Sequence, residues 1–267
     1  MTRVVAITGG ARGIGLATAR AFAATGATVA IGDVDADLAA TVAADLGGHG
    51  HPLDVRDRTS FAAFLDAVGP VDVLVNNAGV APAGRFLDTD PALIDLVVEV
   101  NLRGVLTGMR LALPAMVARG SGLVVNIASL AGRVPLPGAA TYGASKHAVV
   151  GLTGAVRAEL RGTGVRVSAV LPTFTRTELV SGLRLGMLPS VDPGAVADAV
   201  VRVATHRRPP AYVTVPRWLT GLGALHAVLP PRLREYALGL ALATEETTDA
   251  AARAGYEARV AGLLHRP

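Results

Sequence analysis

Short apolar runs alternate with longer segments of helical character along most of the chain. Each run is rich in valine, mostly continuous rather than alternating, and bounded by glycine or proline. Such runs are typical of strands in a parallel sheet that is covered on both faces. We expect strands over residues 3–7, 28–32, 51–53, 71–75, 122–128, 165–171 and 211–215.

The segments between these runs are rich in alanine and leucine, and their apolar residues recur at helical spacing. We expect helices over residues 13–25, 36–46, 57–68, 90–119, 141–161 and 192–205. The last of these begins with Asp192 and Pro193, which resemble an N-cap followed by proline at the first helical position. Alternating strands and helices predict an α/β fold with a doubly wound parallel, Rossmann-like sheet.

The alternation stops near residue 216, and no domain break precedes that point. We expect one dinucleotide-binding and catalytic domain over residues 1–215 and a C-terminal helical extension over residues 216–267. Helices are expected over 231–243 and 245–263 of this extension. Its apolar side chains, Trp218 among them, leave four options open: packing on the domain, closure over a pocket, contact with a partner subunit, or peripheral contact with a membrane.

Composition excludes several classes of protein. The chain has no cysteine, so disulfides, thiolate catalysis and cysteine-based zinc sites are excluded, and we expect no metal site. The N-terminal apolar run is too short for a signal peptide, and no uncharged apolar stretch of about 18 residues suggests a transmembrane helix. We therefore expect a cytoplasmic protein. The net charge is +4, but the arginines are scattered, so no nucleic-acid partner is expected.

A glycine-rich loop follows the first expected strand and opens the first expected helix. Residues 8–15 are TGGARGIG, with glycines at positions 9, 13 and 15 in the GxxxGxG spacing. Without a Cβ, the backbone can turn tightly and approach a pyrophosphate, which then lies at the helix N-terminus. Such a loop alone is also compatible with an ordinary strand-to-helix turn. Its position and Asp33 at the end of the next strand favour nucleotide binding.

Asp33 also bears on the choice of cofactor. A carboxylate at this point accepts hydrogen bonds from the hydroxyls of the adenosine ribose and repels a 2′-phosphate. Arg12 in the glycine-rich loop argues the other way if it pairs with such a phosphate, although it is equally compatible with a solvated surface charge. We expect NAD in preference to NADP.

The segment Tyr142-Gly-Ala-Ser-Lys146 places a tyrosine and a lysine four residues apart on an expected helix. That spacing puts both side chains on one face. The reference pKa of tyrosine, about 10, is too high for a base at neutral pH, and a nearby ammonium lowers it. A surface pair with this spacing is common, so the pattern alone is weak. However, Lys146 is the single lysine among 25 lysine and arginine residues.

Over about residues 2–215 the sequence resembles the short-chain dehydrogenase/reductase family. The motifs that carry the resemblance occur in the family's order: TGGARGIG (8–15), Asp54-Val55, NNAG (76–79), Asn101 in VNLRG, Ser129 in NIASLAG, YGASK (142–146), and Pro172 with Thr177. Thr173 departs from the family pattern, in which glycine usually follows the proline. This departure puts the backbone path beside the nicotinamide in question.

The resemblance implies a role for each matching residue. Tyr142 is expected to be the general acid/base, Ser129 to bind the substrate oxygen, Lys146 to tune the tyrosine and hold the ribose, and Asn101 to anchor a water that connects Lys146 to solvent. Taken singly, Asn101 also suits a helix kink, and Ser129 a strand-end cap. The expected cofactor-binding residues are Gly9, Arg12, Gly13, Ile14, Gly15, Asp33, Asp54, Val55, Asn77, Ala78, Gly79, Tyr142, Lys146, Pro172, Thr175 and Thr177.

Residues that would cover the substrate are mostly apolar. They comprise Leu130, Val134, Pro135, Leu136 and Pro137 before the catalytic helix, and Leu179, Val180, Leu183, Leu185, Met187 and Leu188 after the sixth strand. This lining favours a small apolar alcohol or ketone, although the same leucines would also suit a core beneath the loop.

We therefore expect an oxidoreductase that transfers a hydride between NAD and an apolar secondary alcohol or ketone. The alternatives are an NADPH-dependent carbonyl or 3-oxoacyl reductase and, from another class, a non-catalytic nucleotide-binding regulator. Apolar residues on several faces of helices 90–119 and 141–161 predict a homodimer or homotetramer.

Overall fold

The computed structural model describes residues 2–182, 189–230, 232–233 and 249–265. Seven parallel strands form one sheet in the order β3-β2-β1-β4-β5-β6-β7. The strands are β1 (Val4–Thr8), β2 (Thr28–Asp33), β3 (His49–Pro52), β4 (Val73–Asn76), β5 (Gly122–Ile127), β6 (Val165–Pro172) and β7 (Tyr212–Val215). All seven expected strands are present within a few residues. The winding reverses at β1, where a crevice opens beyond the carboxyl ends of the strands.

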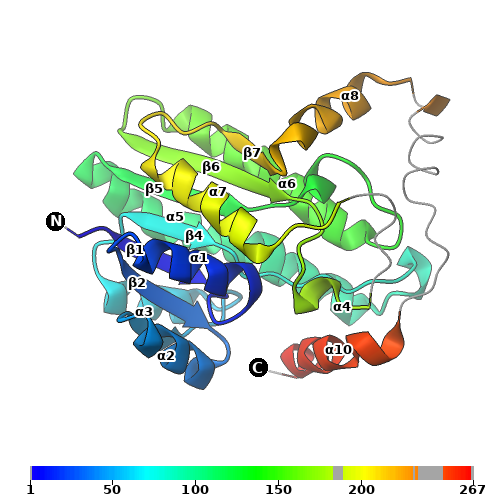
Figure 1. Ribbon diagram of the computed structural model, residues 1–267, viewed down its shortest axis with the longest axis horizontal. Helices are drawn as coiled ribbons and strands as arrows, with labels where there is room; N and C mark the ends of the chain where they lie inside the picture. Colours follow the sequence, from blue (N-terminus) through cyan, green and yellow to red (C-terminus); the bar gives the residue numbers. More distant parts are fainter. Residues whose placement is uncertain (1, 183–188, 231, 234–248, 266–267) are drawn as a thin grey trace.

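Helices cover both faces of the sheet, so the predicted doubly wound fold is confirmed (Figure 1). They are α1 (Gly13–Ala23), α2 (Ala36–Asp45), α3 (Arg58–Val68), α4 (Pro91–Val98), α5 (Gly104–Arg119), α6 (Ala140–Glu159) and α7 (Pro193–Thr205). Successive strand residues face opposite layers. Val5 and Ile7 belong to the core cluster with α1, α2 and α7, while Ala6 belongs to the cluster with α3 to α6. Burial of both faces explains the continuous apolar runs.

The long helix expected over residues 90–119 is interrupted. A π-helical turn spans Glu99–Arg103 between α4 and α5. Such turns are rare and often occur at functional sites. Here the turn contains Asn101, whose side chain is fully buried.

The predicted start of the helix after residue 192 is confirmed in position, with Asp192 as the N-cap residue and Pro193 after it. Helix α7 begins at Pro193 as expected, but the Asp192 side chain makes no capping hydrogen bond. Its carboxylate instead accepts a hydrogen bond of 3.0 Å from Arg176 Nε. A charged partner competes successfully with the backbone amides for this carboxylate.

The C-terminal segment contains a 3-10 turn at Arg217–Gly221, α8 (Leu222–Val228) and α10 (Ala250–Leu264). Helix α10 corresponds to the helix expected over 245–263, whereas most of the one expected over 231–243 lies outside the described residues. Helix α8 was not predicted. No helix in the described part of the chain is both long and apolar enough to cross a membrane. The proposed domain boundary at 215/216 stays a prediction.

Helix α10 is fastened to the rest of the molecule by a buried arginine. The guanidinium of Arg253, 0% exposed, donates hydrogen bonds to the carbonyl oxygens of Ala81 (2.7 Å), Ser181 (3.1 Å) and Leu179 (3.3 Å). Two loops that are almost 100 residues apart in sequence are thereby held to one helix. Figure 1 shows α10, in red, below α4, which it contacts.

The predicted homo-oligomer stays a prediction. Val98, Leu106 and Val117 on α4 and α5 are between 37% and 40% exposed in the single chain. These side chains agree with an interface on those helices without demonstrating one.

The Arg253 anchor leads to a stability prediction. Arg253→Met should lower the free energy of unfolding by about 2–4 kcal/mol, because the substitution leaves three partly or fully buried carbonyl groups without their charged donor. Chemical denaturation followed by circular dichroism measures this change. Arg110→Met, on the exposed side of α5, is the matched control and should shift stability by less than about 0.5 kcal/mol. Equal effects of the two substitutions would contradict the anchoring role.

Candidate active site

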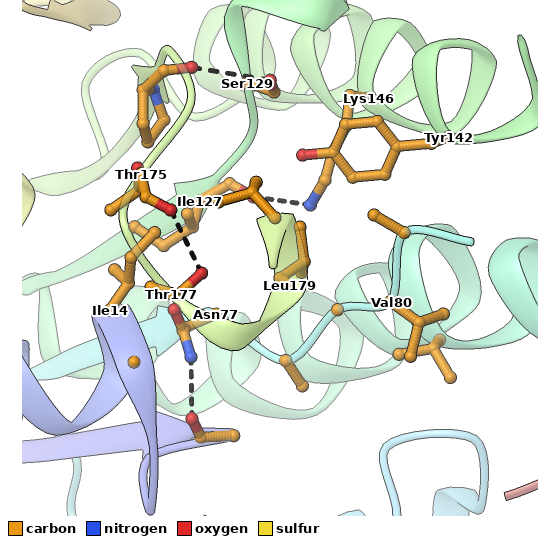
Figure 2. A pocket seen from close by; sticks show the side chains of 18 of the residues that line it. Ile14, Asn77, Val80, Ile127, Ser129, Tyr142, Lys146, Thr175, Thr177 and Leu179 are labelled. Carbon is orange, nitrogen blue, oxygen red and sulfur yellow. Dashed lines mark hydrogen bonds between the residues drawn. The ribbon is translucent and has the colours of Figure 1, made fainter. Parts of the chain in front are cut away.

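A cavity of about 980 Å³ lies at the carboxyl ends of the strands. All but two of the expected site residues line it, sixteen in total; the exceptions are Gly15 and Asn101. The residues expected to bind only the cofactor are Gly9, Arg12, Gly13, Ile14, Asp33, Asp54, Val55, Asn77, Ala78, Gly79, Pro172, Thr175 and Thr177. Ser129 is expected to act in catalysis, and Tyr142 and Lys146 are expected to act both in catalysis and in cofactor binding. Figure 2 shows Tyr142 and Lys146 near Ser129, with Ile14, Asn77, Thr175 and Thr177 farther along the pocket.

The glycine-rich loop folds tightly because its glycines lack side chains. Gly9 and Gly13 have positive φ angles of 60° and 53°. A Cβ on Gly9 would lie 2.8 Å from the Cα of Ala78, and one on Gly15 would lie 2.6 Å from the side-chain nitrogen of Asn77. Gly15 therefore acts through packing behind the loop, which explains its absence from the cavity wall.

Asn77 joins this loop to the loop after β4. Its side-chain amide donates to the carbonyl oxygens of Thr8 and Gly9, both at 2.9 Å. In return, the Thr8 hydroxyl accepts hydrogen bonds from the backbone amides of Asn77 and Ala78. Asn77 thus supports the cradle, in addition to lining it.

The cradle suits a dinucleotide pyrophosphate. Arg12, the residue before α1, makes no side-chain capping bond, so the amides of Gly13, Ile14 and Gly15 have no recorded acceptor among the described residues. Free amides at a helix N-terminus that lines a cavity bind anions.

Carboxylates surround the place expected for the adenosine ribose. The Asp33 carboxylate accepts hydrogen bonds from the backbone amides of Ala11 (3.1 Å) and Asp35 (3.2 Å). These bonds hold the side chain in place at the end of β2. Arg12 forms an ion pair with Asp35 at 2.8 Å, and both side chains are a little over 40% exposed. The arginine that argued for NADP therefore already has a carboxylate partner.

Asp54 has a partner that was not expected. Arg56 donates hydrogen bonds to the Asp54 carboxylate from Nε (3.0 Å) and Nη2 (2.6 Å). It also donates a hydrogen bond of 3.0 Å to the carbonyl oxygen of Leu263 in α10. The side-chain hydrogen bond with Asp54 raises the pKa of Arg56, against the opposing effect of burial. The expected contact of Asp54 with an adenine amino group stays a prediction, and it would have to share this carboxylate.

Tyr142 and Lys146 lie one turn apart on α6, as their spacing predicted. The Lys146 ammonium is 5.6 Å from the centre of the Tyr142 ring and donates a 2.9 Å hydrogen bond to the carbonyl oxygen of Ile127 at the end of β5. Only 4% of Lys146 is exposed. Burial lowers the pKa of Lys146 to about 8, because desolvation disfavours the charged amine.

The electrostatics of Tyr142 differ from the expectation. Burial raises the pKa of Tyr142, and the hydrogen bond with the Ser129 side chain opposes this rise with a smaller effect. The expected lowering of the tyrosine pKa below its free value is therefore wrong for the chain by itself. Any such lowering must come from positive charge added when the site is filled.

Asn101 acts as a brace in this structure. Its Oδ1 accepts a hydrogen bond from the backbone amide of Val80 (2.8 Å). Its Nδ2 donates to the Val80 carbonyl oxygen (2.9 Å) and to Ser145 Oγ (3.2 Å). Asn101 lies within the π-helical turn that interrupts the expected helix. A Cβ on Gly79 would lie 3.2 Å from Asn101 Oδ1 and 3.6 Å from Lys146 Nζ, so the bare glycine leaves space between them. The water relay stays a prediction.

Thr173 fits where the family pattern has glycine. No described residue other than glycine has a positive φ, so this position needs no left-handed backbone. The Thr173 hydroxyl donates to the carbonyl oxygen of Pro189 at 2.9 Å, and its amide donates to Val215. The substitution is absorbed without displacing Thr175 or Thr177 from the cavity wall.

The expected substrate lining is present in part, and Pro135 and Pro137 do not line the cavity. Leu130, Val134, Leu136, Leu179 and Val180 line the cavity, whereas positions 183–188 lie outside the described residues. The C-terminal segment supplies further lining, from α8, the residue that follows it, and α10: Leu222, Leu225, His226, Leu229, Tyr256, Arg259, Val260, Gly262 and Leu263. The C-terminal segment thus packs on the domain and forms part of the pocket wall, and closure over the pocket stays a prediction. Trp218 is 71% exposed, so its contact with a membrane or subunit stays a prediction.

Comparison with known proteins agrees with this geometry. A protein of Streptomyces virginiae that is named as a monensin polyketide synthase ketoacyl reductase is 38% identical over 232 residues, which cover 83% of this chain and 88% of that protein. The crystal structure of a Brucella melitensis 3-ketoacyl-(acyl-carrier-protein) reductase complexed with NADH has a TM-score of 0.75 and 28% identity, covering 80% of this chain and 96% of the other. A Burkholderia phymatum short chain dehydrogenase/reductase in complex with NAD has a TM-score of 0.76 and 28% identity, with coverage of 85% and 93%.

The family model described as short chain dehydrogenase matches residues 3–187. This range contains the glycine-rich loop, Ser129, and the Tyr142–Lys146 pair. The chain therefore belongs to the short-chain dehydrogenase family of oxidoreductases.

Proposed function

We propose that this protein is an NAD-dependent oxidoreductase that interconverts an apolar ketone and the corresponding secondary alcohol. The observation that carries the proposal is the placement of Ser129, Tyr142 and Lys146 at one end of an otherwise largely apolar cavity, with the glycine-rich cradle at the other. When bound, a nicotinamide dinucleotide supplies or accepts the hydride. The residues of the chain bind the substrate oxygen, transfer the proton and orient the substrate.

In the proposed chemistry, the Ser129 hydroxyl and the Tyr142 hydroxyl bind the substrate oxygen together. Tyr142 gives its proton to that oxygen during reduction and takes one back during oxidation. Charge that develops on the oxygen is stabilised by these prepositioned donors. Lys146, held by the Ile127 carbonyl oxygen, brings positive charge near the phenol and is placed to bind a ribose hydroxyl.

The acidic surroundings of the ribose position support NAD. Asp33, Asp35 and Asp37 all line this end of the cavity, where a 2′-phosphate would meet like charge. A second candidate, reduction of 3-oxoacyl compounds, is favoured by the ketoacyl reductase names of similar proteins. It differs in substrate rather than in the catalytic residues.

The catalytic pair can be tested by substitution. Tyr142→Phe and Lys146→Arg should each lower kcat/KM by about 10²–10⁴-fold, because phenylalanine has no proton to transfer and a planar guanidinium cannot take the place of the compact amine. The double variant should be little worse than either single one, since the two residues act as a unit. Turnover is followed at the nicotinamide absorbance on a panel of ketones and alcohols, with Arg110→Lys as the control. A Lys146→Arg enzyme of near-normal rate would refute the assignment.

Cofactor choice gives a second prediction. NADH should have the higher kcat/KM, and Asp33→Ala should narrow its advantage over NADPH. Asp35→Asn should narrow it further, because asparagine keeps the helix cap on α2 while Arg12 loses its ionic partner. Asp45→Asn, an exposed residue at the end of α2, changes the net charge equally and should leave the ratio unaltered. A wild-type preference for NADPH would overturn the NAD proposal.

The single lysine allows its ionisation to be observed directly. Protein grown on [¹³Cε]lysine should give one lysine Cε resonance, and its titration midpoint should be at about pH 8 in the free enzyme. Below this pH the amine is charged, and above it the amine becomes neutral while an unfolded lysine, with a pKa of about 10.4, still holds its proton. In denaturant the midpoint should return to that value. A midpoint above pH 10 in the folded protein would show that burial does not depress this pKa.

A further inference from the structure

Helix α10 lies along the cavity and contributes Tyr256, Arg259, Val260 and Leu263 to its wall. Its position is fixed from several sides. Arg253 donates hydrogen bonds to three loop carbonyl oxygens, and Arg259 forms an ion pair with Glu178. The carbonyl oxygen of Leu263 accepts a hydrogen bond from Arg56. A side chain on this helix is therefore held at a defined place relative to the catalytic residues.

Tyr256 is the least exposed polar residue that α10 contributes to this wall. It is 8% exposed, and the guanidinium of Arg253 lies 4.9 Å from the centre of its ring. Its hydroxyl oxygen accepts a hydrogen bond of 2.6 Å from the backbone amide of Ala81, which also lines the cavity. A phenol can donate as well as accept. Among the described residues, no acceptor is recorded for the Tyr256 hydroxyl hydrogen.

Tyr256 and Tyr142 both line the cavity, and a charge on Tyr142 raises the pKa of Tyr256. Burial is the larger cause, and together these effects raise the pKa of Tyr256 to about 12 despite the Ala81 hydrogen bond and the nearby arginines. Tyr256 consequently keeps its proton at neutral pH and stays a neutral donor.

The surroundings limit what such a donor can bind. Leu130, Val134, Leu179 and Leu222 make the neighbouring wall apolar. The cations of α10 are already engaged, because Arg253 binds backbone carbonyl oxygens and Arg259 pairs with Glu178. A neutral oxygen fits this arrangement better than a free carboxylate, which would require a cation when desolvated.

Resting on the function proposed above, we propose that the Tyr256 hydroxyl donates a hydrogen bond to a second oxygen of the substrate. The preferred ketones then carry another carbonyl near the one that is reduced, as 3-oxo esters and 3-oxo thioesters do. Tyr142 and Ser129 bind the reacting oxygen, Tyr256 binds the second one, and the apolar wall receives the hydrocarbon part. Tyr256 is thereby a specificity-determining residue.

The experiment compares two substrates in two variants. One substrate is a methyl 3-oxo ester, and the other is a plain ketone of matched length without the ester carbonyl, both assayed with NADH. Tyr256→Phe should lower kcat/KM for the oxo ester by about 10-fold, mainly through KM, and leave the plain ketone within about twofold. The ratio of the two substrates within each variant removes any difference in their intrinsic reactivity.

Tyr212→Phe is the matched control. The Tyr212 hydroxyl donates to the carbonyl oxygen of Val150 away from the cavity, so this variant should keep the wild-type ratio. An equal loss on both substrates in Tyr256→Phe would mean that Tyr256 only holds the Ala81 loop, and it would overturn the inference, as would no loss on either. If the wild type reduces neither ketone nor any other tested carbonyl compound, the result contradicts the proposed function itself, and the inference about Tyr256, which rests on it, is rejected as well.

Discussion

The buried ammonium of Lys146 is the constraint on which the rest of the site depends. An amine that is 4% exposed and has one recorded hydrogen bond, to Ile127, loses most of its hydration. Burial of this kind is costly and is tolerated where the surrounding structure fixes it. The neighbouring features serve that purpose: β5 ends at the bonded carbonyl oxygen, α6 places the stem of the lysine, and Gly79 leaves space for its nitrogen.

A series of hydrogen bonds connects the loop beside Lys146 to the C-terminal helix α10. Asn101 clamps Val80 with two hydrogen bonds, which fixes the loop that carries Gly79. One residue further along, Ala81 is bound by Tyr256 through its amide and by Arg253 through its carbonyl oxygen. The loop after β4 is therefore held between the π-helical turn and α10. A helix at the end of the chain thus stabilises a loop that forms part of the catalytic pocket.

Local patterns sufficed to predict the sheet, the glycine-rich loop and the placement of Tyr142 and Lys146 on one face of a helix. Strand composition is set by burial on both faces, and the Tyr142–Lys146 spacing is set by one helical turn, so both are visible within a few residues. The remainder depends on contacts across the chain. Arg56 with Leu263 and Ala81 with Tyr256 join residues separated by 207 and 175 positions, and nothing near either residue in the sequence indicates its partner.

Competition between partners explains the other differences. Asp192 had the sequence context of a helix cap, and Asp54 that of an adenine ligand. Each carboxylate is bound by an arginine, and the adenine contact of Asp54 stays a prediction. A local pattern identifies which bonds a side chain can make, but the choice among them is decided by which charge the fold brings near. Thr173 departs from the family pattern, yet the fold accommodates it. Its hydroxyl donates a hydrogen bond to a carbonyl oxygen, and its backbone needs no left-handed conformation.

Burial acts on Tyr142 and Lys146 in opposite directions, and this affects the protonation state of the proposed catalytic pair. It raises the pKa of the Tyr142 phenol and lowers that of the Lys146 amine to about 8. Both shifts favour neutral groups in a site of low polarity. At neutral pH the chain by itself therefore holds Tyr142 as an acid with its proton in place, next to an amine that is still mostly charged. In the proposed function, this is the protonation state that reduction of a ketone needs. Oxidation of an alcohol needs the phenol to accept a proton, so it depends more strongly on positive charge brought by the cofactor.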